Sequence, residues 1–354
     1  MFILRMLLEI AVMIGLCVIA GLVAVKIIFK KKGKKKLSIK KVKTIVFDVN
    51  KVKEDVAIPA IKGKDELAYY EVLQGLNDIA EDKNIKKVII DVDELSLTFS
   101  QLEEISKIFD KIRKNKEVVA IGTLFDENKY RQALLADKIY MLDTRQSTFI
   151  FRGYLHKELY LKSFLEKFGV KMNVLHIGNY KVAGEKYNHN EMSEEKKESI
   201  KNIKDKVFED FVKLVKDKRG TDIEEEILNG DLIFAGKEKA LEYKLIDGVA
   251  DYDEIGINYK EDTVSLEDYI SMSKEKKEKA KDTIAVINLE GVIDGRNSKK
   301  SITYENVCDK LEILEKMKNL KGLVLRINSP GGSALVSEKI YKKLKKVTVP
   351  IYVS

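Results

Sequence analysis

A pair of adjacent glycines lies where the apolar pattern of the chain changes. In "LRINSPGGSALVSE" (residues 325–338), a run typical of a buried strand leads into Pro330, Gly331 and Gly332. A helical pattern then begins at Ser333. Glycines at such a point either allow a tight turn or leave backbone N–H groups bare for a negatively charged group. The pair by itself favours the turn, and both interpretations stay open on this pattern.

One lysine stands apart from the charged runs of this lysine-rich chain. Lys181 lies in "GNYKVAG" (residues 178–184), with Tyr180 and Val182 beside it. A lysine amine can act as a base when it is neutral, which requires its pKa to fall by roughly three units from about 10.4 through burial in an apolar, closed site. Most lysines are solvated surface residues, so this setting alone does not identify a catalytic residue.

The elements that must position these residues occur twice. "NIKKVIIDVD" (residues 84–93) matches "NLKGLVLRIN" (residues 319–328), and each copy follows the order strand, helix, buried strand, helix, strand. Such alternation predicts an α/β fold with a largely parallel sheet. We predict a first copy over residues 44–270, a charged linker over 271–282 and a second copy over 283–354. The second copy ends inside a core strand, so we expect it to be incomplete and the chain to be a fragment.

A long helix is predicted within the first copy, ahead of the linker. Ser193 is a typical first residue, and Gly220 supplies the stop. The helical spacing of its apolar residues predicts one buried face, made of Ile200, Ile203, Val207, Phe211, Leu214 and Val215.

The N-terminal region predicts a membrane anchor. Residues 10–25 carry no charge, and the segment 2–29 is long enough to cross a hydrocarbon core of about 30 Å. The run is longer than the apolar part of a cleaved signal peptide, so we expect an uncleaved single span. Residues 30–43 form a polybasic juxtamembrane segment, which by the positive-inside rule belongs in the cytoplasm.

Charge and composition exclude several classes of function. The net charge is +8, of which residues 1–43 contribute +10, leaving −2 for the rest. A basic surface interleaved with aromatic residues is missing from this pattern, so we expect no nucleic-acid partner. Two cysteines, Cys17 and Cys308, and three histidines show no metal-ligand spacing. We therefore expect neither a metal nor another cofactor.

Several segments together resemble the long, duplicated form of the signal peptide peptidase family. "LRINSPGGSALVSEKIY" is similar to its second repeat, and "IGNYKVAGEKYNHNEMSEEKKESI" (residues 177–200) to its G-x-Y-K-S-A-x-E-P segment. The resemblance extends from about residue 44 to residue 354. It implies a duplicated ClpP/crotonase-like fold and a membrane-anchored serine endopeptidase with a Ser/Lys dyad, which degrades cleaved signal peptides.

The resemblance also implies roles for particular residues. Lys181 would be the general base, while Gly331 and Gly332 would supply oxyanion-hole N–H groups. Two departures are visible, because Val182 replaces the family's serine and Lys186 replaces its proline. Ser329 is better interpreted as a turn residue and Ser333 as an N-cap than as nucleophiles. The family's nucleophilic serine would follow residue 354, so we expect this chain alone to be inactive.

The resemblance further implies a homo-oligomer and a body outside the cytoplasm at the inner membrane. That location conflicts with the positive-inside rule, and we favour the location that the resemblance implies. Two other classes of function remain in comparison. An acyl-CoA enzyme of the crotonase type would need neither Lys181 nor an anchor. A non-catalytic membrane-anchored scaffold of the same fold would need no serine beyond residue 354.

Overall fold

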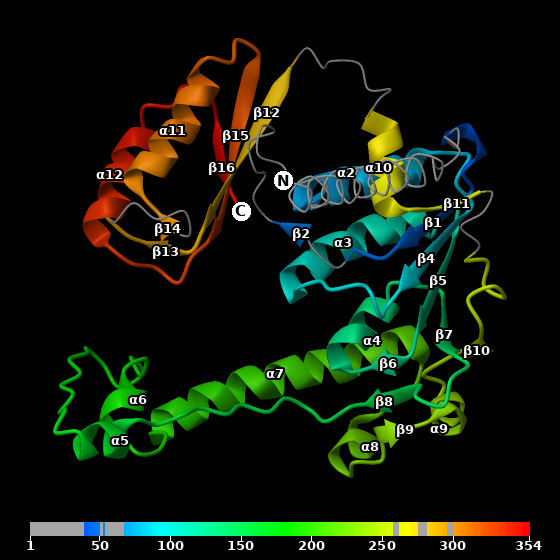
Figure 1. Cartoon of the computed structure of the whole chain (residues 1–354), viewed down its shortest axis with the longest axis horizontal. Helices are drawn as coiled ribbons and strands as arrows, with labels where there is room; N and C mark the ends of the chain where they lie inside the picture. The colour runs from blue at the N-terminus through cyan, green and yellow to red at the C-terminus, as the bar shows by residue number, and fades with distance from the viewer. Residues whose placement is uncertain (1–38, 50–51, 54–66, 258–261, 275–281, 296–300) are drawn as a thin grey trace, which may run out of the picture.

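The computed structural model of the chain describes residues 39–49, 52–53, 67–257, 262–274, 282–295 and 301–354. Two parallel sheets with helices packed on them make the fold α/β (Figure 1). The expected anchor (2–29) and residues 30–38 of the polybasic segment lie outside the described residues. Within the described ranges, no helix is both long and apolar enough to cross a membrane.

The first sheet has six parallel strands in the order β10-β7-β5-β4-β1-β11. Its strands are β1 (Thr44–Phe47), β4 (Lys87–Asp91), β5 (Glu117–Gly122), β7 (Lys138–Leu142), β10 (Gly248–Ala250) and β11 (Thr263–Ser265). Apolar clusters lie on both faces, as a parallel sheet requires. Helices beside this sheet include α2 (Tyr69–Glu81), α3 (Phe99–Ile112) and α10 (Leu266–Lys274). The last of these extends into the segment predicted as a linker, whose residues 275–281 lie outside the description.

The second sheet repeats the core of the first. Its parallel order β12-β15-β16 corresponds to β1-β4-β5, which confirms the predicted strand–helix alternation. The strands are β12 (Thr283–Glu290), β15 (Leu320–Asn328) and β16 (Ile351–Val353). Helices α11 (Tyr304–Glu315) and α12 (Ala334–Leu344) occupy the places of α2 and α3 in chain order. The shared order shows that two distant segments of the chain adopt one supersecondary plan.

Arg326 on β15 connects the second sheet to the first copy. Its Nη1 lies 3.3 Å from Oε2 of Glu104, and its guanidinium stacks 5.1 Å from the ring centre of Tyr69.

Further elements of the described residues are η1 (Ile39–Lys41), β2 (Val52–Lys53), β3 (Leu67–Ala68), β6 (Leu124–Phe125), α4 (Glu127–Ala133), β8 (Thr148–Ile150), α8 (Glu224–Leu228), β9 (Ile233–Ala235), α9 (Lys237–Glu242), β13 (Val292–Ile293) and β14 (Ser301–Ile302).

Helix α7 (Glu194–Arg219) forms an arm that leaves the first copy (Figure 1). Ser193 caps its start and Gly220 ends it with a φ of 69°, as predicted. The arm's free end carries α5 (Lys162–Lys167) and α6 (Glu185–Asn188). The predicted buried face is correct for the C-terminal half of α7 and wrong for Ile203, which is 65% exposed. The N-terminal half extends beyond the core that buries the rest.

Asp91, at the end of β4, makes the stability of the first copy depend on pH. Burial, followed by the negative charge of Asp93, raises the pKa of Asp91 to about 6. This carboxyl binds more protons in the folded state than in the unfolded chain, so stability falls as pH rises from about 4 to about 6. Asp91→Asn should therefore stabilise the protein by roughly 2–3 kcal/mol at pH 8 and little at pH 4, as measured by urea unfolding. Equal stabilities of the two proteins at pH 8 would contradict this assignment.

Candidate active site

The glycine pair forms a tight turn between β15 and α12. Gly331 and Gly332 have φ angles of 104° and 152°, which favour glycine. The N–H of Ile293 on β13 donates to the Gly331 carbonyl (2.9 Å), and the N–H of Ser333 donates to the Ile293 carbonyl (2.8 Å). A Cβ at Gly332 would lie 2.0 Å from that Ile293 oxygen. Both glycines are therefore needed for the turn itself.

The same turn leaves one backbone donor open. The N–H of Gly331 donates to Oγ of Ser329 (3.1 Å). The N–H of Gly332 has no hydrogen-bond partner within the part of the chain that the structure describes. It precedes the first turn of α12, where unpaired N–H groups give a helix its partial positive charge. Turn formation and anion binding are thus compatible at this site.

The serines near the turn have structural roles. Oγ of Ser333 accepts from the N–H of Val336 (3.4 Å), which confirms its predicted place as the N-cap of α12. Ser329 is a turn residue, also as predicted, because its Oγ holds Gly331. Ser354 continues β16, where its N–H donates to the carbonyl of Leu325 (2.8 Å).

The first copy has a different arrangement at the corresponding place. Asp93 aligns with Asn328, and its Oδ2 accepts from the N–H and the hydroxyl of Thr123 (both 2.8 Å). Nζ of Lys129 lies 3.7 Å from the same carboxylate. Asp126 occupies the N-cap of α4, where a nucleophile would be expected by analogy, and its Oδ1 accepts from the Lys129 N–H (2.8 Å). Backbone donors that could bind an anion in this copy are thus already used by a carboxylate.

Lys181 lies at the free end of the arm, four residues before α6. Its side chain is exposed, and the neighbouring Tyr180 hydroxyl donates to Glu198 on α7 (2.7 Å). That hydrogen bond raises the pKa of Tyr180 because it favours the protonated phenol. The apolar enclosure that a neutral lysine requires is not formed around Lys181 by the described residues.

Glu185 anchors the lysine segment to the arm, a role that its place in the motif did not indicate. It is 8% exposed on an otherwise exposed tip. Its carboxylate accepts from the hydroxyl of Ser193 and, at 3.4 Å, from the Ser193 N–H. Gly184 packs so closely that a Cβ there would lie 2.3 Å from a methyl of Val174. Ser193 also caps α7, so these contacts hold the segment that carries Lys181 against the N-terminal end of that helix.

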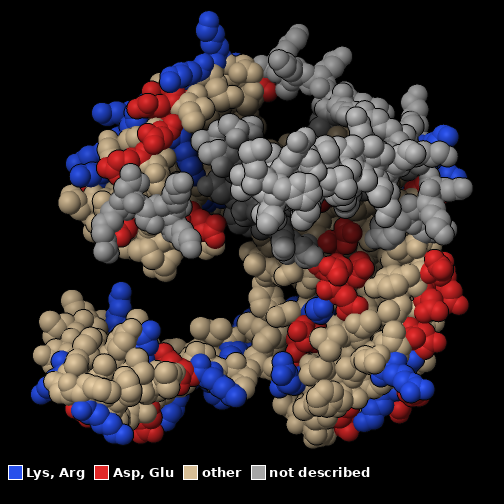
Figure 2. Space-filling model, viewed as in Figure 1, with Lys and Arg blue, Asp and Glu red and all other residues tan. Residues whose placement is uncertain are grey.

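The structure does not bring Lys181 to the glycine turn. In Figure 1, α6 and the β13–β14 pair that lies beside the turn are drawn apart, and no hydrogen bond or ion pair joins them among the described residues. The arm tip instead exposes large apolar side chains, namely Leu159, Phe164, Phe168, Val170, Leu175 and Ile177. Figure 2 shows the surface of this tip as a lobe that is joined to the first copy along the arm, with open space between the lobe and the second copy in that view.

Comparisons with known proteins match both copies. A family described as Peptidase family S49 matches residues 110–267, and one described as Clp protease matches residues 275–354. Protease 4 of Haemophilus influenzae is 25% identical over 316 residues, which cover 82% of this chain and 51% of that protein. The chloroplastic serine protease SPPA of Arabidopsis thaliana is 26% identical over 299 residues, covering 78% and 43%. The chain thus spans about half the length of the curated relatives it matches.

Similar solved structures include two variants of the 1510-N membrane-bound stomatin-specific protease. The first has a TM-score of 0.33 and 18% identity, covering 60% of this chain and 83% of that one. The second, in complex with a substrate peptide, has the same TM-score and 15% identity. The match covers 63% of this chain and 90% of that one. The family matches and the curated relatives agree with the resemblance noted in the sequence. The chain therefore contains a peptidase family S49 domain and a Clp protease-like domain, and it is related to the enzymes named Protease 4 and SPPA.

Proposed function

We propose that the protein is a serine-type endopeptidase whose oxyanion hole includes the glycine turn. The observation that carries the proposal is the unpaired N–H of Gly332 at the start of α12. Such an N–H stabilises the oxyanion of a tetrahedral intermediate because charge develops there in the transition state. Gly331 would contribute a second donor once Ser329 releases its N–H.

Lys181 would act as the general base for a serine that the second copy supplies after residue 354. The domain limits predicted from the sequence assign the lysine to the first copy and the oxyanion turn to the second, so the site is composite. The experiment that tests this function begins with the coding sequence beyond codon 354. A serine before two glycines, together with hydrolysis of apolar peptides by the encoded protein, would support the peptidase. A stop codon would favour the alternative, a membrane-anchored scaffold without catalysis.

A second copy of the chain would complete the site. The arm tip carries Lys181 together with six exposed apolar side chains, and such a patch on a soluble surface is typical of an interaction site. Docking of this tip beside the glycine turn of a neighbouring molecule would enclose the lysine in apolar surroundings and favour its neutral form. A homo-oligomer is thus part of the proposal.

Charged substitutions on the arm tip should therefore disrupt the oligomer. Leu175 and Ile177 are 97% and 94% exposed, so replacing both with aspartate should cost the fold little. We expect the double variant to elute as a smaller species in light-scattering chromatography and to lose at least about tenfold in association constant. Leu228→Asp on α8, 70% exposed and outside the arm, is the matched control. An unchanged mass for the double variant would exclude the tip as the interface.

The substrates and location extend the same proposal. Cleaved signal peptides and other apolar peptides near the membrane would be the substrates, held close by the anchor over residues 2–29 at the inner membrane. The body would lie outside the cytoplasm. Digestion of the body by protease added to intact spheroplasts would support this topology, whereas full protection would place the body in the cytoplasm, as the lysine-rich segment predicts.

A further inference from the structure

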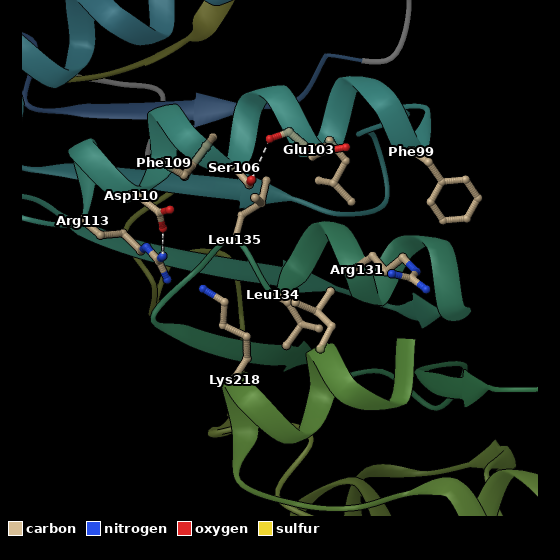
Figure 3. Close-up of a pocket in the computed structure, with 12 residues that line it drawn as sticks. Phe99, Glu103, Ser106, Phe109, Asp110, Arg113, Arg131, Leu134, Leu135 and Lys218 are labelled. Atoms are coloured by element: carbon tan, nitrogen blue, oxygen red, sulfur yellow. Dashed lines mark hydrogen bonds and ion pairs between the residues drawn. The ribbon is translucent and has the colours of Figure 1, made fainter. Parts of the chain in front are cut away.

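A cavity in the first copy has no part in the proposed peptidase site. It has a volume of about 360 Å³ and lies between α3, α4 and α7 (Figure 3). This volume falls within the range of about 300–1,000 Å³ that is typical of small-molecule sites. Its walls are mainly apolar and include Phe99, Leu102, Phe109, Leu134, Leu135 and Leu214.

Two cations lie together at one end of this cavity. Arg113 and Lys218 both line it, and Figure 3 shows their charged groups on the same side of Leu135. The guanidinium of Arg113 pairs with Asp110 and more weakly with Asp137, at 4.0 Å. Its Nε is buried and has no hydrogen-bond partner within the described residues. Asp110 also lines this end and pairs with Arg113, whereas Lys218 forms no ion pair in the described part of the chain, so its ammonium is available to a ligand.

The middle of the cavity offers little to a peptide backbone. The hydroxyl of Ser106 already donates to the carbonyl of Glu103 in its own helix (2.8 Å). At the opposite end, Arg131 donates to the carbonyl of Val207 (2.8 Å) and stacks on the ring of Phe99 at 5.2 Å. A peptide in this space would leave buried amides without partners, which is costly, whereas a hydrocarbon chain has none to satisfy.

We propose that this cavity binds an aliphatic carboxylate of about ten carbons. The hydrocarbon chain would lie against Leu102 of α3, Leu214 of α7 and the two leucines that follow α4, where each buried methylene favours binding. The carboxylate would accept from Nζ of Lys218, which gives that unpaired cation a partner. This site is independent of the glycine turn and of Lys181, so it stands whether or not the protein is a peptidase.

Photolabelling of the full chain with a diazirine-bearing decanoate tests the site. We expect the label within residues 99–113, 131–135 and 214–218, mapped by mass spectrometry. We also expect competition by decanoate but not by decyltrimethylammonium, which has the same chain and the opposite charge. Lys218→Glu should weaken competition by decanoate at least about tenfold, because it replaces a cation with an anion. Lys213→Glu, exposed on the same helix and outside the cavity, should leave it unchanged.

Four results would overturn the proposal. Label scattered over the surface would show that no cavity site exists. Equal competition by decanoate and decyltrimethylammonium, or an unchanged response in both Lys218→Glu and Lys218→Gln, would show that the charged end does not recognise a carboxylate. Stronger competition by acetyl-trileucine than by decanoate would assign the cavity to peptides instead.

Discussion

Gly332→Ala should destabilise the second sheet by about 2–5 kcal/mol, combining a steric clash with a φ of 152° that alanine rarely adopts. The clash is with backbone, since the new Cβ would lie 2.0 Å from the Ile293 carbonyl oxygen and 2.8 Å from its carbon. The backbone of Ile293 is held by the pairing of β13 with β14, so it cannot rotate away from the new Cβ as a side chain could. Urea unfolding, together with hydrogen exchange of β15 and α12, measures the loss.

Gly331→Ala is the matched control for this effect. Its φ of 104° is also strained for alanine, but nothing lies within 4 Å of the added Cβ. We expect a smaller loss of about 1–3 kcal/mol, which reflects the backbone strain alone. Equal losses in the two variants would mean that contact with Ile293 does not explain the second glycine.

Lys181→Met in the catalytically complete protein should lower kcat by at least about 10³-fold, since the general base would be lost while an apolar stem of similar length remains. The exposed position of Lys181 predicts little change in thermal stability. Peptide hydrolysis and circular dichroism measured on the same preparation separate these effects.

Lys186→Met provides the comparison on the same arm tip. Its amine lies 5.0 Å from the ring centre of Tyr187, a contact that stabilises α6 and touches no proposed catalytic group. We expect this variant to retain most activity. Loss of activity in Lys186→Met, with normal hydrolysis in Lys181→Met, would reverse the assignment of the base.

The repeated strands and the helix caps could be predicted because their causes are local. Runs such as Val88–Ile90 and Leu323–Leu325 are apolar at successive positions, as fully buried parallel strands require. The predicted caps are also present. An N-cap needs only a side-chain oxygen near the first N–H groups, which Ser193 and Ser333 supply, and a C-cap needs only a residue that tolerates a positive φ, which is Gly220. These signals need no knowledge of distant residues.

The arm could not be predicted, and the glycine pattern alone left the open amide undecided, because both depend on the absence of neighbours. An apolar stripe such as that containing Ile203 indicates that a surface will be covered, but not by which molecule. The need for glycine at position 332 comes from Ile293, whose approach no short-range pattern reveals. The environment of Lys181 could not be predicted either, because the sequence of a lysine segment is the same whether the folded protein encloses that segment or exposes it.

The length of α7 has a mechanical consequence. A helix of 26 residues is about 39 Å long, so a tilt of about 5° at its base moves the far end by roughly 3 Å. Proton transfer from a serine requires the amine within about 3 Å of the hydroxyl, so thermal bending of an unsupported arm would repeatedly break that alignment. Activity should therefore rise more steeply than in proportion to protein concentration. Such a peptidase would stay latent when dilute and would become active where its copies gather.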